Sequence, residues 1–131
     1  MAMSINMLSS MLPKSDLELF QSGARAARSG SWAYDPEAAG EVAVFCSIML
    51  GTCRLIQRHI PDDVEKCAQA IADKRREHEG HCNQCQDEAS MLTLQNWRPP
   101  AKDILEHLAS MGEELVPVSY THLTLPTKRI V

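Results

Sequence analysis

Apolar residues recur every three to four positions along most of this chain, which is the spacing of an amphipathic helix. In the first such segment Phe20 and Ala24 lie four residues apart, and Ser15 and Glu18 form the S-x-x-E pattern of a capping box. This pattern predicts a first helix from about residue 16 to residue 28. The Ser-Gly-Ser sequence that follows is expected to end it.

The second predicted helix is the longest and the most apolar. Asp35 suits the N-cap position and Pro36 suits the first helical position. The stretch VAVFCSIMLGTC, residues 42 to 53, is apolar on nearly every side, which is typical of a helix that its neighbours bury. We expect this central helix to run from 36 to about 60, where Pro61 would stop it. Its large side chains are expected to be buried, namely Phe45, Ile48, Met49 and Leu55.

A third helix is predicted to begin near residue 63, because Asp62 and Glu65 repeat the spacing of a capping box. Residues that could face a core recur every seven positions across Gly80, so the sequence leaves open whether this helix continues past it. Glycine costs about 1 kcal/mol in a helix interior. We therefore expect a break at residues 79 to 82.

Two further helices complete the expected fold. One should run from 83 to 96 and stop at the Pro99-Pro100 pair, and the last should run from 101 to about 111 with Gly112 as its cap. Only 5% of the residues are aromatic, which suits helix packing better than a sheet. The sequence predicts an all-α fold, a small bundle of four to five helices with a long buried central helix.

The end of the chain differs from the rest. The string VSYTHLTLPT, residues 118 to 127, contains no acidic residue and shows no helical period. It resembles the translation, in one reading frame, of a transposase-type sequencing adapter. The resemblance implies a helical domain over residues 1 to 116, truncated at its native C-terminus, and a non-native tail over residues 117 to 131. A genuine threonine-rich terminus is the alternative.

The charge of the chain limits its partners. The net charge is -4, and without Lys128 and Arg129 of the tail it becomes -6. An acidic chain is a poor non-specific partner for nucleic acid or for an anionic membrane, so we expect neither. A protein partner or a homo-oligomer is the expected assembly. A membrane anchor formed by residues 38 to 56 stays as an alternative, although Glu41 and Arg54 interrupt that stretch.

The five cysteines indicate the cellular compartment. Their number is odd, and they are spread through apolar and helical segments without the density of a small disulfide scaffold. The N-terminus has no positively charged region ahead of an apolar core, as a secretory signal would. We therefore expect a cytoplasmic protein with reduced thiols.

One short stretch, HEGHCNQC at residues 78 to 85, suggests chemistry. Cys82 and Cys85 form a CxxC pair, the spacing at which two thiolates reach one tetrahedral zinc ion. His78 is suited to be a third ligand, whereas His81 is a poorer one because immediate neighbours rarely point at the same ion. The predicted metal residues are therefore Cys82, Cys85, His78 and His81. A further ligand could also come from elsewhere, with Cys53, His59, Cys67 and His107 as candidates.

Two other interpretations of this stretch stay open. His78 and Cys85 can be packing residues on one helix face, and Cys82 with Cys85 can be a redox-active thiol pair, for which a helix N-terminus would be favourable. We assign no catalytic residue. The sequence favours a small non-enzymatic helical interaction or regulatory module, and a structural zinc in this module is one option beside plain packing. A thiol-dependent redox enzyme that uses Cys82 and Cys85 is the first alternative, and a membrane-associated protein is the second.

The tail gives a first testable prediction. Residues 118 to 131 share neither period nor composition with the predicted helices. Deleting them should leave the melting temperature unchanged in a thermal unfolding experiment. A decrease of several degrees, which corresponds to more than about 1 kcal/mol in a domain of this size, would show that they belong to the fold.

Overall fold

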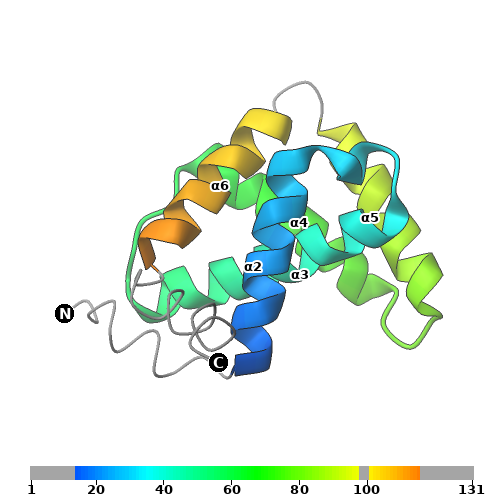
Figure 1. Cartoon of the computed structure of the whole chain (residues 1–131), viewed down its shortest axis with the longest axis horizontal. Helices are drawn as coiled ribbons and strands as arrows, with labels where there is room; N and C mark the ends of the chain where they lie inside the picture. The colour runs from blue at the N-terminus through cyan, green and yellow to red at the C-terminus, as the bar shows by residue number, and fades with distance from the viewer. Residues whose placement is uncertain (1–13, 98–100, 116–131) are drawn as a thin grey trace, which may run out of the picture.

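The computed structural model describes residues 14 to 97 and 101 to 115, and within these ranges the chain is all-α (Figure 1). The helices are α2 (Lys14–Ser29), the short 3-10 helix η1 (Ser31–Ala33), α3 (Pro36–Leu55), α4 (Asp62–Glu77), α5 (Asn83–Asn96) and α6 (Ala101–Leu115). The predicted fold class is confirmed. The predicted tail and its boundary lie outside the described residues.

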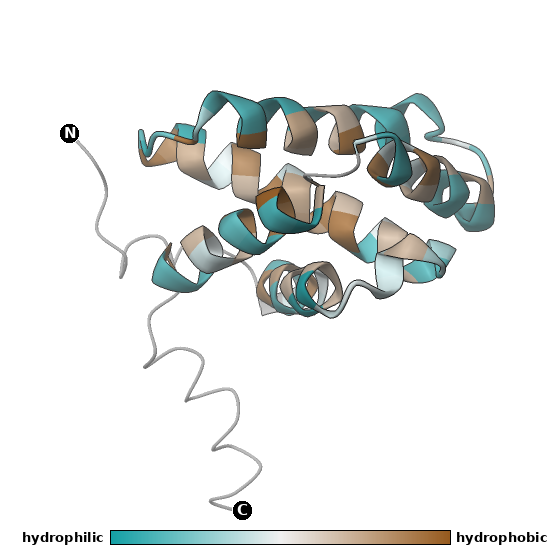
Figure 2. Ribbon diagram, turned by 90° about the horizontal axis from the view of Figure 1, so that it is seen from above, coloured by the Kyte–Doolittle hydropathy of each residue, from teal (hydrophilic) through white to brown (hydrophobic). Residues whose placement is uncertain are grey.

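Helix α3 is the centre of the bundle. It packs against α2, α4, α5 and η1, while α6 packs against α2 and α4. Figure 2 shows that the apolar sides of the helices face the interior and that their polar sides face outward. The predicted buried central helix is therefore confirmed. Its buried residues are Ala38, Ala39, Gly40, Val42, Ala43, Phe45, Cys46, Met49, Leu50, Thr52 and Cys53.

The start of α3 agrees with the sequence prediction, and its end does not. The Asp35 carboxylate accepts a hydrogen bond from the Glu37 N–H at 3.0 Å, and Pro36 is the first helical residue. The helix ends at Leu55, before the end that we predicted from Pro61. Leu55, which was expected to be buried, is 51% exposed, so this part of the prediction is wrong. Phe45 and Met49 are fully buried, and Ile48 is partly buried against the core.

Helix α3 ends in a hydrogen-bonded C-terminal motif and not at a proline. The Gln57 N–H donates to the Arg54 carbonyl at 3.3 Å, and the Arg58 N–H donates to the Cys53 carbonyl at 2.8 Å. These two bonds form a Schellman motif, which needs a residue in the left-handed region. Gln57 takes that conformation, with φ of 57°. Glutamine is rare there, so the sequence carried no recognisable stop signal before Pro61.

The break between α4 and α5 is confirmed. Gly80 has φ of +92°, a left-handed conformation that glycine adopts without strain, and it reverses the chain between the two helices. Helix α5 spans the predicted residues. The predicted capping box at the start of α4 is wrong, because Asp62 is already within the helix and the residue at the N-cap position is Pro61, which makes no side-chain cap.

The prediction that Gly112 caps the last helix is also wrong. Helix α6 continues to Leu115, and Gly112 is buried within it. A Cβ atom at this position would lie 2.5 Å from Cζ of Phe20, which is closer than two carbon atoms can approach. The glycine is therefore needed for close packing of α6 against α2, and it does not end the helix.

Two phenylalanines join three of the helices. The rings of Phe20 on α2 and Phe45 on α3 meet edge to face, with 5.2 Å between centroids and 69° between planes. A Cβ atom on Gly23 of α2 would lie 2.3 Å from the Cβ of Phe45, so this glycine lets α2 approach α3. Each aromatic ring thus lies against a glycine of a neighbouring helix. This arrangement fixes α2, α3 and α6 relative to one another.

A partly buried ion pair joins the other side of the bundle. Arg75 of α4 pairs with Asp87 of α5, and their side chains are 25% and 15% exposed. The pair lies against Gly40 of α3, where a Cβ atom would be 2.0 Å from the Asp87 carboxylate. Because only glycine leaves room here, α4 and α5 are held together directly over the central helix.

The glycines give a matched pair of substitutions. Gly112→Ala should destabilise the fold by about 1 kcal/mol or more, because the methyl group overlaps the Phe20 ring. Gly51→Ala should stabilise it by about 0.5–1 kcal/mol, because the Cβ at this helical position meets nothing within 4 Å and alanine favours the helix. Urea denaturation of dilute protein measures both. Shifts of the same sign in the two variants would contradict this packing.

Candidate functional site

All four residues that the sequence predicts as metal ligands lie in or beside the turn between α4 and α5, but the structure brings only His78 and Cys85 into side-chain contact. We call residues 78 to 85 the α4–α5 corner. His78 is the C-cap residue of α4, and Cys82 is the N-cap residue of α5. The left-handed Gly80 lies between them. The chemistry-bearing side chains therefore stand at the facing ends of two helices.

The closest pair at the corner is His78 and Cys85. The His78 Nδ1 atom lies 3.4 Å from the Cys85 Sγ atom, and both side chains are partly buried. The Gln86 side-chain amide donates to the His78 carbonyl at 3.1 Å, which ties the end of α4 to α5. The two residues are seven positions apart in sequence, and it is the chain reversal that makes them neighbours.

Cys82 occupies a defined position at the start of α5. Its Sγ atom accepts a hydrogen bond from the Cys85 N–H at 3.4 Å, as an N-cap side chain does. Residues at the N-cap and three positions later lie on the same side of the first helical turn. Cys82 is exposed, whereas Cys85 is half-buried. The solvent therefore reaches Cys82 more readily.

His81 lies against His78 and makes no hydrogen bond to either thiol. Its Nδ1 atom is 3.2 Å from the His78 carbonyl oxygen, and the two rings are 5.5 Å apart between centroids. Contacts at the corner thus run from His81 to His78, then to Cys85 and Cys82. In residues 14 to 97 and 101 to 115, no three His, Cys, Asp or Glu side chains gather closely enough to hold a metal ion.

The other candidate ligands lie away from the corner. Cys53 and Cys67 are buried in the core, where burial raises the pKa of both thiols. For Cys67 the pKa rises to about 12, with Asp63 as a second cause. Such thiols stay protonated at neutral pH and act as packing residues. His59 follows α3 and His107 lies on α6, and no hydrogen bond among the described residues joins either of them to the corner.

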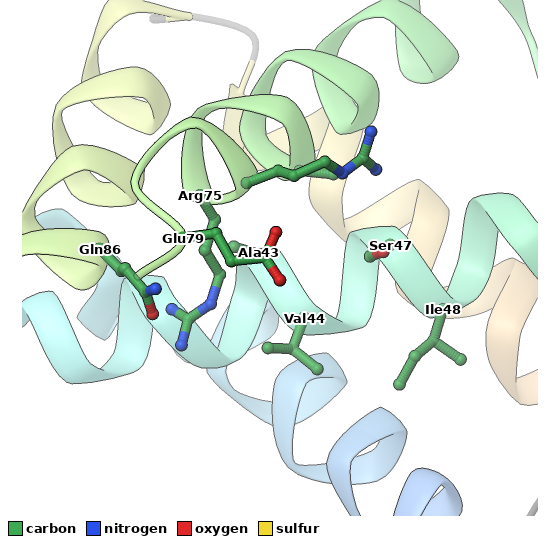
Figure 3. Close-up of a pocket in the computed structure, with 9 residues that line it drawn as sticks. Ala43, Val44, Ser47, Ile48, Arg75, Glu79 and Gln86 are labelled. Carbon is green, nitrogen blue, oxygen red and sulfur yellow. The ribbon is translucent and has the colours of Figure 1, made fainter. Parts of the chain in front are cut away.

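An open groove of about 350 Å³ lies beside the corner, between α3 and α4 (Figure 3). Two of its basic side chains already have carboxylate partners, because Arg75 pairs with Asp87 and Arg76 with Asp73. The sequence interpretation missed this groove, since it depends on which side of α3 stays uncovered. Its lining residues are Ala43, Val44, Ser47, Ile48, Ala72, Arg75, Arg76, Glu79 and Gln86.

The apolar composition of α3 also bears on the membrane alternative. Within the part of the chain that the structure describes, Pro36–Leu55 is the one helix long and apolar enough to cross a bilayer. Of the most apolar 18-residue window of this helix, 61% is buried inside the fold. A buried core helix has this composition for reasons of packing, so length and hydropathy alone are weak support for a membrane anchor.

Comparisons with known proteins add no family to this description. No protein-family model matches the chain, and no curated protein or solved structure gives a match. The functional argument therefore rests on the geometry of the corner and of the helix surfaces.

Burial divides the five thiols into two groups with different expected reactivity. In native protein a thiol reagent should modify Cys82 and Cys85 rapidly, because both are accessible to solvent. Cys46, Cys53 and Cys67 should react only after unfolding, because they are buried and burial raises their pKa, which keeps them protonated. Peptide mapping of the modified chain measures this. Fast modification of a third cysteine in folded protein would contradict the core assignment.

Proposed function

We propose that this chain is a small helical interaction module whose α4–α5 corner binds one zinc ion through His78, His81, Cys82 and Cys85. The supporting observation is the 3.4 Å distance between His78 Nδ1 and Cys85 Sγ. Two ligands of a tetrahedral zinc ion, with bonds of about 2.0–2.3 Å, stand about 3.5 Å apart. This pair therefore already has the separation of one edge of a zinc site.

The remaining two ligands would have to turn toward the His78–Cys85 pair. Cys82 and His81 are both exposed, so their side chains turn without disturbing the core. Ordering such a side chain costs about 0.5–1.5 kcal/mol, which is small beside the binding energy of a structural zinc ion. The Cys85 N–H that donates to Cys82 Sγ would also stabilise the negative charge of a metal-bound sulfur.

A zinc ion at this position would have a structural role. Its ligands come from the end of α4, the turn and the start of α5, so it would fix the angle between the two helices. The packing of both helices on α3, the Arg75–Asp87 pair and the hydrogen bond from Gln86 to His78 also hold that angle. Both thiols must be reduced to bind metal, so the proposal places the chain in a reducing compartment such as the cytoplasm.

Apolar residues on the surface of the bundle are the reason to propose an interaction module. Val44 and Ile48 are only partly covered, and Leu55 is 51% exposed, all three on the same helix. Exposed apolar residues that adjoin one another are typical of docking surfaces. Zinc at the corner would stabilise a scaffold that presents this surface.

Zinc content tests the proposal directly. Protein purified under reducing conditions without chelator should contain about one zinc per chain, measured by elemental analysis. Cys82→Ser and Cys85→Ser should each abolish binding, and His78→Ala should weaken it, because too few ligands remain for a closed site. His59→Ala and His107→Ala are matched controls, since both residues are exposed histidines outside the corner. Zinc should also raise the melting temperature of the metal-free protein.

Two results would contradict the zinc proposal. One is a metal-free protein whose melting temperature does not change with added zinc. The other is cobalt(II) binding without the sulfur-to-metal absorption band, which would show that thiolates are not ligands.

A second candidate, dithiol redox chemistry, is favoured by one observation, the position of Cys82 as the exposed N-cap residue of α5. The Cys82 thiolate would attack a substrate disulfide and release one substrate thiolate. Cys85 would then attack the Cys82 sulfur, which releases the second thiolate and leaves a Cys82–Cys85 disulfide. A metal-free protein that forms this disulfide reversibly in glutathione buffers would favour this candidate over zinc.

A further inference from the structure

Among residues 14 to 97 and 101 to 115, no other helix covers one side of α3, although α3 is the central helix. Its buried residues face α2, α4 and α5, and its uncovered residues form a stripe with helical spacing. Figure 3 shows Val44, Ser47 and Ile48 on the part of this stripe beside the groove. We call the stripe the outer face of α3, and it consists of Glu37, Glu41, Val44, Ser47, Ile48, Gly51, Arg54 and Leu55.

Charge is distributed unevenly along the outer face. Glu37 and Glu41 lie at its N-terminal end, Arg54 lies near its C-terminal end, and the middle is uncharged. The Glu41 carboxylate accepts a hydrogen bond from the Ser22 hydroxyl, and it forms no ion pair with a described basic residue. Arg54 is exposed, and its guanidinium donates to the Gln69 side-chain oxygen at 2.7 Å and lies 3.9 Å from the Glu65 carboxylate. Each end thus presents a charge that an outside group of opposite sign can approach.

Side-chain size also varies along the outer face of α3. Gly51 leaves open space, because nothing lies within 4 Å of a Cβ built there, and Ser47 is small and exposed. Val44 and Ile48 are the branched residues of the same stretch. If a second α3 lies antiparallel with its centre between residues 47 and 48, each branched residue meets a small one. Val44 then faces Gly51, and Ile48 faces Ser47.

We propose that the outer face of α3 binds the same face of a second copy of this chain in an antiparallel arrangement. In that register Glu41 of one copy faces the partner's Arg54, and two such pairs form because a two-fold interface is self-complementary. A parallel arrangement would place Glu37 and Glu41 against the same acidic residues, which is repulsive. The inference rests on the proposed interaction module and specifies its partner, and it does not depend on zinc.

A second copy fits this face better than a bilayer does. If α3 spanned a bilayer, Glu41 and Arg54 would have to lie within or at the edge of the hydrocarbon, and charged residues within a membrane-spanning helix are costly. A second copy supplies both the opposite charges and the matching shape. Because small interfaces are weak, the expected state is a dimer that dissociates on dilution.

Sedimentation equilibrium of the full chain tests self-association. The protein should change from monomer to dimer as its concentration rises, with and without chelator. Gly51→Trp should raise the dimer dissociation constant by at least about 30-fold, because the indole would occupy the space into which the partner's Val44 packs. The fold should be retained, because this position is open in the monomer. Leu55→Glu should also weaken the dimer, whereas Leu92→Glu, at an equally exposed leucine on α5, should not.

Charge reversal tests the antiparallel register. Glu41→Lys and Arg54→Glu should each be monomeric alone, because like charges then meet across the interface. An equimolar mixture of the two variants should form a heterodimer, since every facing pair again has opposite charges. Circular dichroism checks that each variant is folded before the experiment.

The outcomes separate this inference from the zinc proposal. A wild-type chain that stays monomeric up to about 1 mM overturns the dimer. So does a dimer unaffected by Gly51→Trp, or binding of the monomer to neutral lipid vesicles through this face. Zinc content measured on the same samples tests the zinc site separately. A metal-free dimer refutes only the zinc proposal, and a zinc-bound monomer refutes only the dimer.

Discussion

The close approach of three helices at the Phe20–Phe45 contact is the constraint on which the rest of this bundle depends. The edge-to-face rings lie between Gly23 on α2 and Gly112 on α6, and a methyl group at either glycine would collide with a ring carbon or a neighbouring Cβ. The two glycines let α2 approach α3 and let α6 pack closely against α2. On the other side, Gly40 leaves room for the Arg75–Asp87 pair, which positions α4 and α5.

The candidate functional corner is a product of that packing. Helices α4 and α5 both contact α3 and each other, so the turn between them is held over the central helix. The left-handed Gly80 then brings His78 next to Cys85, while Cys82 takes the N-cap of α5. Zinc and dithiol chemistry use the same two thiols here. They differ in whether His78 and His81 act as ligands or as neighbours.

The two opposite faces of the central helix α3 have different roles. Its inner side fills the core with apolar residues, and its outer side keeps small and branched residues between an acidic and a basic end. The corner and the outer face of α3 adjoin the same groove, which includes Gln86 from α5 and Val44 from α3. A metal that stiffens the corner would therefore also hold one wall of the proposed dimer surface in place.

The sequence by itself determined the all-α class, the central helix with its Asp35 and Pro36 start, and the break at Gly80, because these depend on local periodicity and on backbone preferences. Only the tertiary structure decided the rest. Gly112 resembles a cap in sequence, yet it has a packing role because the Phe20 ring of another helix lies against it. Helix α3 ends before Gln57 through backbone hydrogen bonds that the residue types there do not predict. The same holds for the corner, since the CxxC spacing of Cys82 and Cys85 predicts chemistry, but the 3.4 Å between His78 and Cys85 arises from chain reversal. Which side of α3 stays uncovered is likewise set by contacts between distant segments, which local pattern does not contain.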